Sequence, residues 1–107
     1  MALEEVKHGE VRDAVERFLD DVNETVRFHA VQTTYAQQDR ASLPKLVRLL
    51  LDEESVRVKN KIAEGLLLRG WEIPEENRQA ADSALRDTDI YSVGADGRIV
   101  KEARGLR

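Results

Sequence analysis

The feature that most constrains the fold of this chain is an internal repeat of 32 residues. When residues 11–37 are moved forward by 32 positions, their apolar and acidic positions fall on those of residues 43–69. The matching pairs are Val11 and Leu43, Ala14 and Leu46, Val15 and Val47, Phe18 and Leu50, Leu19 and Leu51, Asp20 and Asp52, Val26 and Val58, Arg27 and Lys59, Ala30 and Ile62, and Val31 and Ala63. Repetition at a period of a few tens of residues is typical of supersecondary units that stack. We therefore expect two copies of one unit that share a continuous apolar seam.

Each copy has the apolar spacing of an amphipathic helix pair. Apolar residues recur at i, i+3, i+4, i+7 and i+8, which is the stripe of a helix with one buried face. The expected helices span residues 10–20, 24–38, 43–51, 56–69 and 74–86, with a turn at residues 52–54. The expected N-caps are Asn23, Ser42 and Ser55, and Gly70 is the expected left-handed residue after the fourth helix. The stripe predicts an all-α chain of about five helices.

The last helix opens a third unit that the chain does not complete. Its doublets Ala80-Ala81 and Ala84-Leu85 repeat the spacing of the earlier first helices. The partner helix is replaced by two β-prone runs around a Gly/Asp-rich turn at residues 94–97, which predicts a small hairpin over the end of the stack. An irregular tail is the alternative. At the other end, Leu3 and Val6 suggest a short helix that is the remnant of an upstream unit in a longer array.

Length and composition indicate one domain over residues 1–107. Its parts are units at about residues 10–39 and 42–70, a partial unit at 74–86, and a cap or tail at 87–107. The chain has a net charge of −4, no cysteine and no apolar run long enough to span a membrane. These features disfavour nucleic-acid binders, which carry a basic patch, and membrane proteins. We expect a cytoplasmic protein.

The second copy carries a recognisable motif. It reads Leu43-Pro44-x-Leu46-x-x-Leu49-Leu50-x-Asp52, followed by Val58-Lys59-x-x-Ile62-Ala63-x-Gly65-Leu66. This segment resembles a HEAT-like repeat, and its short unit is similar to the phycobilisome-lyase type. The resemblance covers about residues 10–86 and implies an α-α superhelix, or helical solenoid. It also implies a structural ladder in which Asp20 and Asp52 bond backbone N–H groups, or Arg27 and Lys59 of the same or the next unit.

The residues that usually carry chemistry do not form a catalytic pattern. His8 and His29 have no partner at metal-ligand spacing, and the serines lie in no nucleophile motif. Paired carboxylates such as Glu53 and Glu54 fall in first turns of helices, where the helix dipole favours negative charge. We therefore predict a protein that is not an enzyme and that holds no cofactor or metal.

One face of the second helices departs from this pattern. Aromatic side chains are scarce in the chain, yet two lie away from the apolar stripe of the second helix. Because second helices line the concave surface of such solenoids, we predict a partner groove there. Its residues are Phe28, Gln32, Tyr35, Asn60 and Glu64. The alternative is that Phe28 and Tyr35 pack under the N-terminal segment with Leu3 and Val6.

Three classes of function remain open. The leading prediction is a non-catalytic adaptor or scaffold that binds another protein through the groove. The second is an accessory or chaperone-like subunit of an enzyme such as a phycobilin lyase, as the resemblance implies. The third is nucleic-acid binding, which Glu64 and the acidic net charge disfavour. Neither the partner nor the process follows from the sequence.

Overall fold

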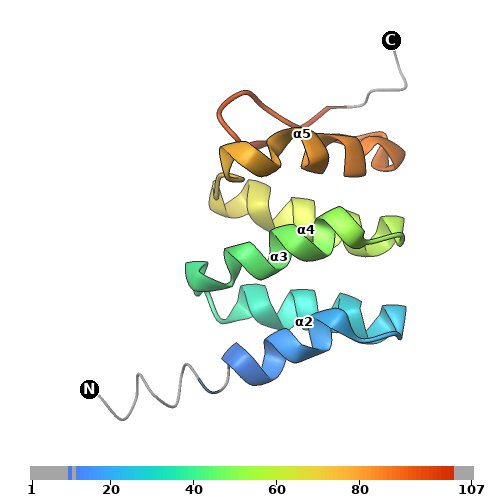
Figure 1. Ribbon diagram of the computed structural model, residues 1–107, viewed down its shortest axis with the longest axis vertical. Coiled ribbons are helices and arrows are strands. Elements are labelled where there is room, and N and C mark those ends of the chain that lie inside the picture. Colours follow the sequence, from blue (N-terminus) through green and yellow to red (C-terminus); the bar gives the residue numbers. More distant parts are fainter. Residues whose placement is uncertain (1–9, 11, 103–107) are drawn as a thin grey trace, which may run out of the picture.

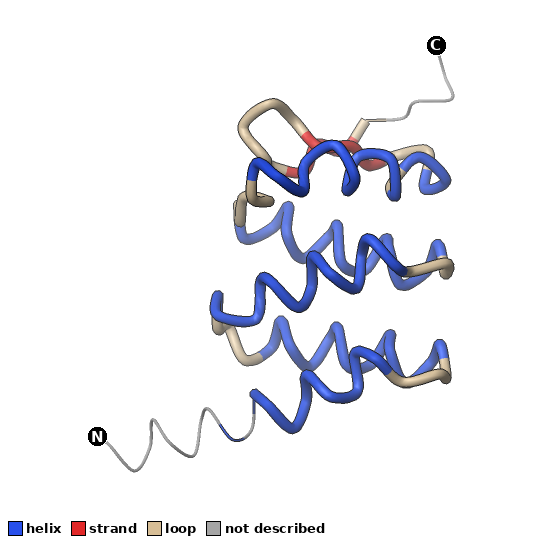
Figure 2. The backbone as a smooth tube through the Cα atoms, viewed as in Figure 1, coloured by secondary structure: helices blue, strands red, loops and turns tan. Residues whose placement is uncertain are grey.

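The computed structural model describes residues 10 and 12–102, and most of this part of the chain is helical. A helical segment over residues 12–17 continues into the short 3-10 helix η1 (Phe18–Asp20). The elements that follow are α2 (Glu24–Ala36), η2 (Arg40–Ser42), α3 (Leu43–Asp52), α4 (Val56–Arg69), α5 (Glu75–Ala84), η3 (Arg86–Thr88), β1 (Tyr91–Val93) and β2 (Ile99–Lys101). The helices form stacked layers (Figure 1), and the strands lie at the C-terminal end of the stack (Figure 2). The predicted all-α solenoid with a small C-terminal hairpin is confirmed.

Three of the predicted helix boundaries are confirmed by local geometry. The Asn23 side chain accepts hydrogen bonds from the first backbone N–H groups of α2, and the Ser55 hydroxyl accepts from the Val58 N–H at 3.2 Å. Gly70 has φ 64° and ends α4 in the left-handed conformation. These groups satisfy backbone donors and carbonyls that a helix end leaves unpaired.

Ser42 is not the predicted N-cap. Its backbone already has helical dihedral angles, so its side chain is not placed to accept from the first turn of α3. The hydroxyl instead donates to a Glu16 carboxylate oxygen at 2.9 Å, and Asp39 accepts from the Ala41 N–H to cap η2. The three residues of η2 therefore lead directly into α3.

The end of α2 repeats the end of α4 with a different residue. Gln38 has φ 56° and lies 32 positions before Gly70, which has φ 64°. The predicted helix over residues 24–38 therefore stops at Ala36, two residues before this left-handed position. The fifth helix likewise ends at Ala84 rather than at Arg86.

The core is a continuous seam between the stacked units. α2 packs on α4, α3 packs on α5, and η1 packs on α3. Fully buried side chains along the seam are Val31, Leu46, Leu50, Val58, Ile62 and Leu66. Burial of an aliphatic side chain of this size contributes about 1.5–3 kcal/mol, so the seam holds the units together.

Equivalent positions do not have equivalent burial in the first unit. Phe18 is 53% exposed, whereas its counterpart Leu50 is 0% exposed. Thr33 is also exposed, whereas its counterpart Gly65 is buried. The prediction that Phe18 shares the buried seam with Leu50 is therefore wrong, because among the described residues no further unit packs on that side of the first one.

The hairpin takes the position of the missing second helix of the third unit. β1 packs on α5 and β2 packs on α4, with Tyr91 and Ile99 buried. The Ile73 N–H donates to the Gly97 carbonyl at 2.8 Å, and the Val93 N–H donates to the Asp82 carboxylate at 2.9 Å. Because these bonds tie β1 to α5, and the hairpin turn to the segment that leads into α5, the hairpin covers the C-terminal end of the core.

Candidate functional site

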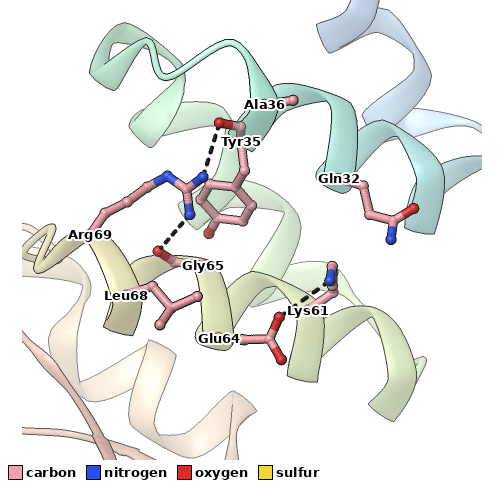
Figure 3. A pocket seen from close by; sticks show the side chains of 8 residues that line it. All are labelled: Gln32, Tyr35, Ala36, Lys61, Glu64, Gly65, Leu68 and Arg69. Atoms are coloured by element: carbon pink, nitrogen blue, oxygen red, sulfur yellow. Dashed lines mark hydrogen bonds and ion pairs between the residues drawn. The ribbon is translucent and has the colours of Figure 1, made fainter.

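An open hollow of about 300 Å³ lies between the solvent-facing sides of α2 and α4. Figure 3 shows its residues, which come from the last turns of α2 and from residues 61–69 of α4. They are Gln32, Tyr35, Ala36, Lys61, Glu64, Gly65, Leu68 and Arg69. The hollow thus joins the second helices of two successive units.

The floor of the hollow is the ring of Tyr35. This side chain is only 4% exposed, and its hydroxyl donates to the Ile62 carbonyl at 2.6 Å. The ring lies against Gly65 so closely that a Cβ atom at that position would overlap it. Burial raises the pKa of Tyr35 well above its ordinary value, so the phenol stays neutral and remains a donor.

Arg69 closes one end of the hollow and holds the floor in place. Its guanidinium carbon lies 4.4 Å from the centroid of the Tyr35 ring and 5.9 Å from that of Trp71. The same group donates to the Tyr35 carbonyl at 3.0 Å and to the Gly65 carbonyl at 3.3 Å. A cation at the C-terminal end of α2 is favoured by the helix dipole, so Arg69 ties the two second helices together.

The rim of the hollow combines charged and apolar side chains. Lys61 and Glu64 form an ion pair of 3.2 Å along α4, and the Gln32 side chain oxygen is 3.1 Å from the His29 ring nitrogen. Leu68 is 75% exposed on the same rim. An exposed leucine beside paired charges can bury apolar area against a partner while leaving few charges unpaired.

The structure brings together three of the five predicted groove residues. Gln32, Tyr35 and Glu64 line the hollow, and Phe28 and Asn60 do not. Phe28 is half-buried with the Arg57 guanidinium 4.1 Å from its ring centroid. Asn60 is also half-buried, and its side chain oxygen has no hydrogen-bond partner among the described residues.

The structure shows what Tyr35 packs against. Tyr35 packs against α4, through Ile62 and Gly65. The predicted contacts of Phe28 and Tyr35 with Leu3 and Val6 lie outside the described residues. Tyr35 is therefore both a core residue and the floor of the hollow.

The five predicted groove residues do not include five others that line the hollow, which are Ala36, Lys61, Gly65, Leu68 and Arg69. A signal for Leu68 was present, because three consecutive leucines at 66–68 cannot all lie on one buried helical stripe. A signal for Arg69 was its position just before Gly70, where cations favour a helix C-terminus. Neither signal indicates that the two side chains meet Tyr35, which is a property of the packing between units.

The predicted ladder exists, but with different acids. Arg27 forms a two-pronged ion pair with Glu53, at 2.7 and 2.9 Å, and this hydrogen bonding raises the pKa of Arg27. Lys59 pairs with Asp87 at 3.1 Å. Glu53 follows α3 in extended conformation, which turns its side chain toward the previous unit and toward the Ser55 N–H.

Asp20 and Asp52 therefore do not have the predicted role. Each lies at the end of its helix with an exposed side chain, and within the described part of the chain neither forms an ion pair or caps a backbone N–H. The ladder runs from the second helix of one unit to the turn of the next, and it stabilises the stack away from the hollow.

Among residues 10 and 12–102, no group of three His, Cys, Asp or Glu side chains is placed to hold a metal ion. No helix in the same part of the chain is long and apolar enough to cross a bilayer.

Comparison with known proteins identifies the family. The family model for HEAT repeats matches residues 1–67, which is more than half of the 107 residues. Comparisons with curated proteins and with solved structures gave no match. The match does not distinguish the short phycobilisome-lyase type from other HEAT repeats. The stacked helix pairs and the matched span agree, and the chain therefore belongs to the HEAT repeat family.

Proposed function

We propose that the chain is a non-catalytic protein–protein interaction module that binds another protein at the hollow between α2 and α4. HEAT repeats are commonly scaffolds for protein interactions, and helical solenoids use extended surfaces for this purpose. The observation that carries the proposal is an exposed Leu68 on the rim of a floor built from Tyr35 and Gly65.

The floor suits binding because it is already ordered without a partner. The Tyr35 hydroxyl is bonded to the Ile62 carbonyl, and Arg69 covers one face of the ring. Little side-chain freedom remains to be lost there when a partner docks, and this lowers the entropic cost of association. The partner would bury Leu68 and Ala36, while Lys61 and Glu64 remain paired at the rim.

The charge of the rim argues for a protein partner over a nucleic acid. Lys61 is neutralised by Glu64, and the chain carries a net charge of −4. Affinity for a phosphate backbone depends on releasing counterions with several unpaired cations. A salt-dependent gel shift with duplex DNA and with RNA should show no complex.

The proposal is tested by comparing what the wild-type chain and its variants capture from cells of the source organism. Leu68→Asp and Ala36→Arg change exposed rim side chains and should leave the helix content by circular dichroism unchanged. Val22→Asp is the matched control, because Val22 is 98% exposed and lies outside the hollow. We expect one protein that the wild type and the control capture in equal amounts. The amount captured should fall at least tenfold with both rim variants. Equal capture by all four chains would refute the site.

The identity of the captured protein decides between an adaptor and an accessory subunit of an enzyme. A pigment-bearing partner, detected by its visible absorbance after capture, would make the chain an accessory subunit of a phycobilin lyase. A colourless partner would leave the adaptor function. Cytoplasmic localisation is part of the same proposal and would be tested by cell fractionation.

A further inference from the structure

The second helices carry more positive than negative charge, although the chain as a whole has a net charge of −4. The cations of α2 and α4 are Arg27, Arg57, Lys59, Lys61 and Arg69, and their acids are Glu24 and Glu64. The side of the stack formed by these helices therefore repels a negatively charged partner less than the rest of the chain does.

Only one of these five cations is without a carboxylate partner. The ion pairs are Arg27 with Glu53, Arg57 with Glu24, Lys59 with Asp87, and Lys61 with Glu64. No carboxylate among residues 10 and 12–102 forms an ion pair with Arg69. The cation that is left over lies in the wall of the hollow between α2 and α4.

The backbone groups around Arg69 compensate only part of its charge. Its guanidinium donates to the Tyr35 and Gly65 carbonyls (Figure 3), and its Nε is buried with no hydrogen-bond partner among the described residues. Both acceptors are neutral groups, and the C-terminal end of a helix is equivalent to only roughly half of an elementary negative charge. Positive charge and donor capacity therefore remain at this end of the hollow.

We propose that the protein bound at the hollow presents an acidic segment, in which a carboxylate binds Arg69 and a neighbouring apolar side chain covers Leu68. This inference rests on the proposed function, because it names the partner of the same site. A charge-assisted hydrogen bond between a guanidinium and a carboxylate is roughly twice as strong as a neutral one. Lys61 and Glu64 stay paired at the rim, so the site offers one unpaired positive charge.

The chemistry of the site favours a carboxylate from a side chain. The single negative charge of a carboxylate matches the single unpaired cation, whereas a phosphate of higher charge would leave negative charge beside Glu64. The hollow is open, so a continuing chain can pass over it. We therefore assign the carboxylate to an aspartate or glutamate side chain of the partner.

Lys61 and Glu64 provide a matched pair of variants for the test. Their side chains are 29% and 50% exposed, so neither substitution disturbs the core. Lys61→Gln and Glu64→Gln remove the same ion pair but change the charge of the hollow in opposite directions. An acidic partner should bind Glu64→Gln more tightly and Lys61→Gln more weakly than the wild type, whereas loss of the ion pair alone would act in one direction. Arg69 itself is left unchanged, because it also holds the Tyr35 ring.

The probe is an acetylated and amidated peptide of about nine residues, with leucine between glutamates, and its control has glutamine in place of each glutamate. Each peptide is titrated into the 15N-labelled full chain and followed by NMR. We expect the amide signals of Gly65, Leu68 and Arg69 to shift, with a Kd for the glutamate peptide about tenfold below that for the glutamine peptide. That Kd should fall about threefold with Glu64→Gln and rise about threefold with Lys61→Gln.

Three results would overturn the proposal. They are no shift of these amides with the glutamate peptide, equal affinity for the two peptides, and a change of affinity in the same direction with both variants. The proposed function is judged separately, by capture from cells. If Leu68→Asp abolishes capture while the peptide titrations fail, the interaction site stands and the acidic segment is rejected. If Leu68→Asp captures as much as the wild type, the interaction site itself fails.

Discussion

Replacing Gly65 by alanine would test how the two units fit together. Gly65 lies in the middle of α4, where alanine normally stabilises a helix by about 1 kcal/mol. Here the added Cβ would overlap the ring of Tyr35, which is buried and bonded to the Ile62 carbonyl. The packing between units therefore disfavours alanine at this position, whereas helix propensity favours it. The sign of the change in the free energy of unfolding shows which of the two contributions is larger.

The magnitude follows from the contacts that Tyr35 would lose. Overpacking of a core costs about 1–3 kcal/mol, and the hydrogen bond of a displaced hydroxyl is worth about 1 kcal/mol. Weaker stacking under Arg69 adds about 0.5–1 kcal/mol. After subtraction of the gain in helix propensity, we expect Gly65→Ala to lower the free energy of unfolding by about 1.5–4 kcal/mol.

The assay is urea denaturation followed by circular dichroism and by the fluorescence of Trp71, whose ring centroid is 6.1 Å from that of Tyr35. A double-mutant cycle with Tyr35→Ala isolates the clash. In that background Gly65→Ala should become neutral or stabilising by up to about 1 kcal/mol, which gives a coupling energy of about 3 kcal/mol. The reasoning fails if Gly65→Ala stabilises the wild-type chain, or if its effect is the same in both backgrounds.

Three other perturbations probe the ladder, a helix end and an exposed ion pair. Glu53→Ala removes a carboxylate that is 1% exposed and leaves the Arg27 guanidinium without its ion-pair partner. It should lower the free energy of unfolding, measured by urea denaturation, by about 2–4 kcal/mol. Asp52→Ala should lower it by less than about 0.5 kcal/mol. Gln38→Gly should raise the free energy of unfolding by about 0.5–1 kcal/mol, because φ 56° is strained for any residue except glycine, and an unchanged midpoint would count against this strain. Hydrogen bonds from Arg57 and then Ser55 lower the pKa of Glu24 from its ordinary 4.5, so its stabilising contribution is present above that pH and is lost as the pH falls through the lower folded value. Glu24→Gln should therefore flatten the acid side of the stability–pH curve, and an unaltered slope would contradict the assignment.

The repeat and the helices could be predicted because they depend on local patterns. Apolar spacing places α3 and α4, and Asn23 and Ser55 accept hydrogen bonds from N–H groups two or three residues further along the chain. Gly70 adopts a backbone conformation that favours glycine. Each of these features is decided within a few residues, where propensity and capping dominate.

The candidate site could be predicted only in part, since it lies between two units. The spacing of α2 and α4 placed Gln32, Tyr35 and Glu64 on one surface, but it did not show that Gly65 leaves room for the Tyr35 ring. The same limit explains the ladder acids, because Glu53 meets Arg27 only after the chain turns back on itself.

The sequence by itself determined the period, the helical stripe and the small residues at the turns, because helix formation responds to neighbours three and four positions away. Only the tertiary structure decided which copies of the repeat are buried. Phe18 and Leu50 occupy the same place in their units, yet one is exposed and the other is not. Burial depends on whether another unit packs against a residue, and no pattern within one unit encodes that.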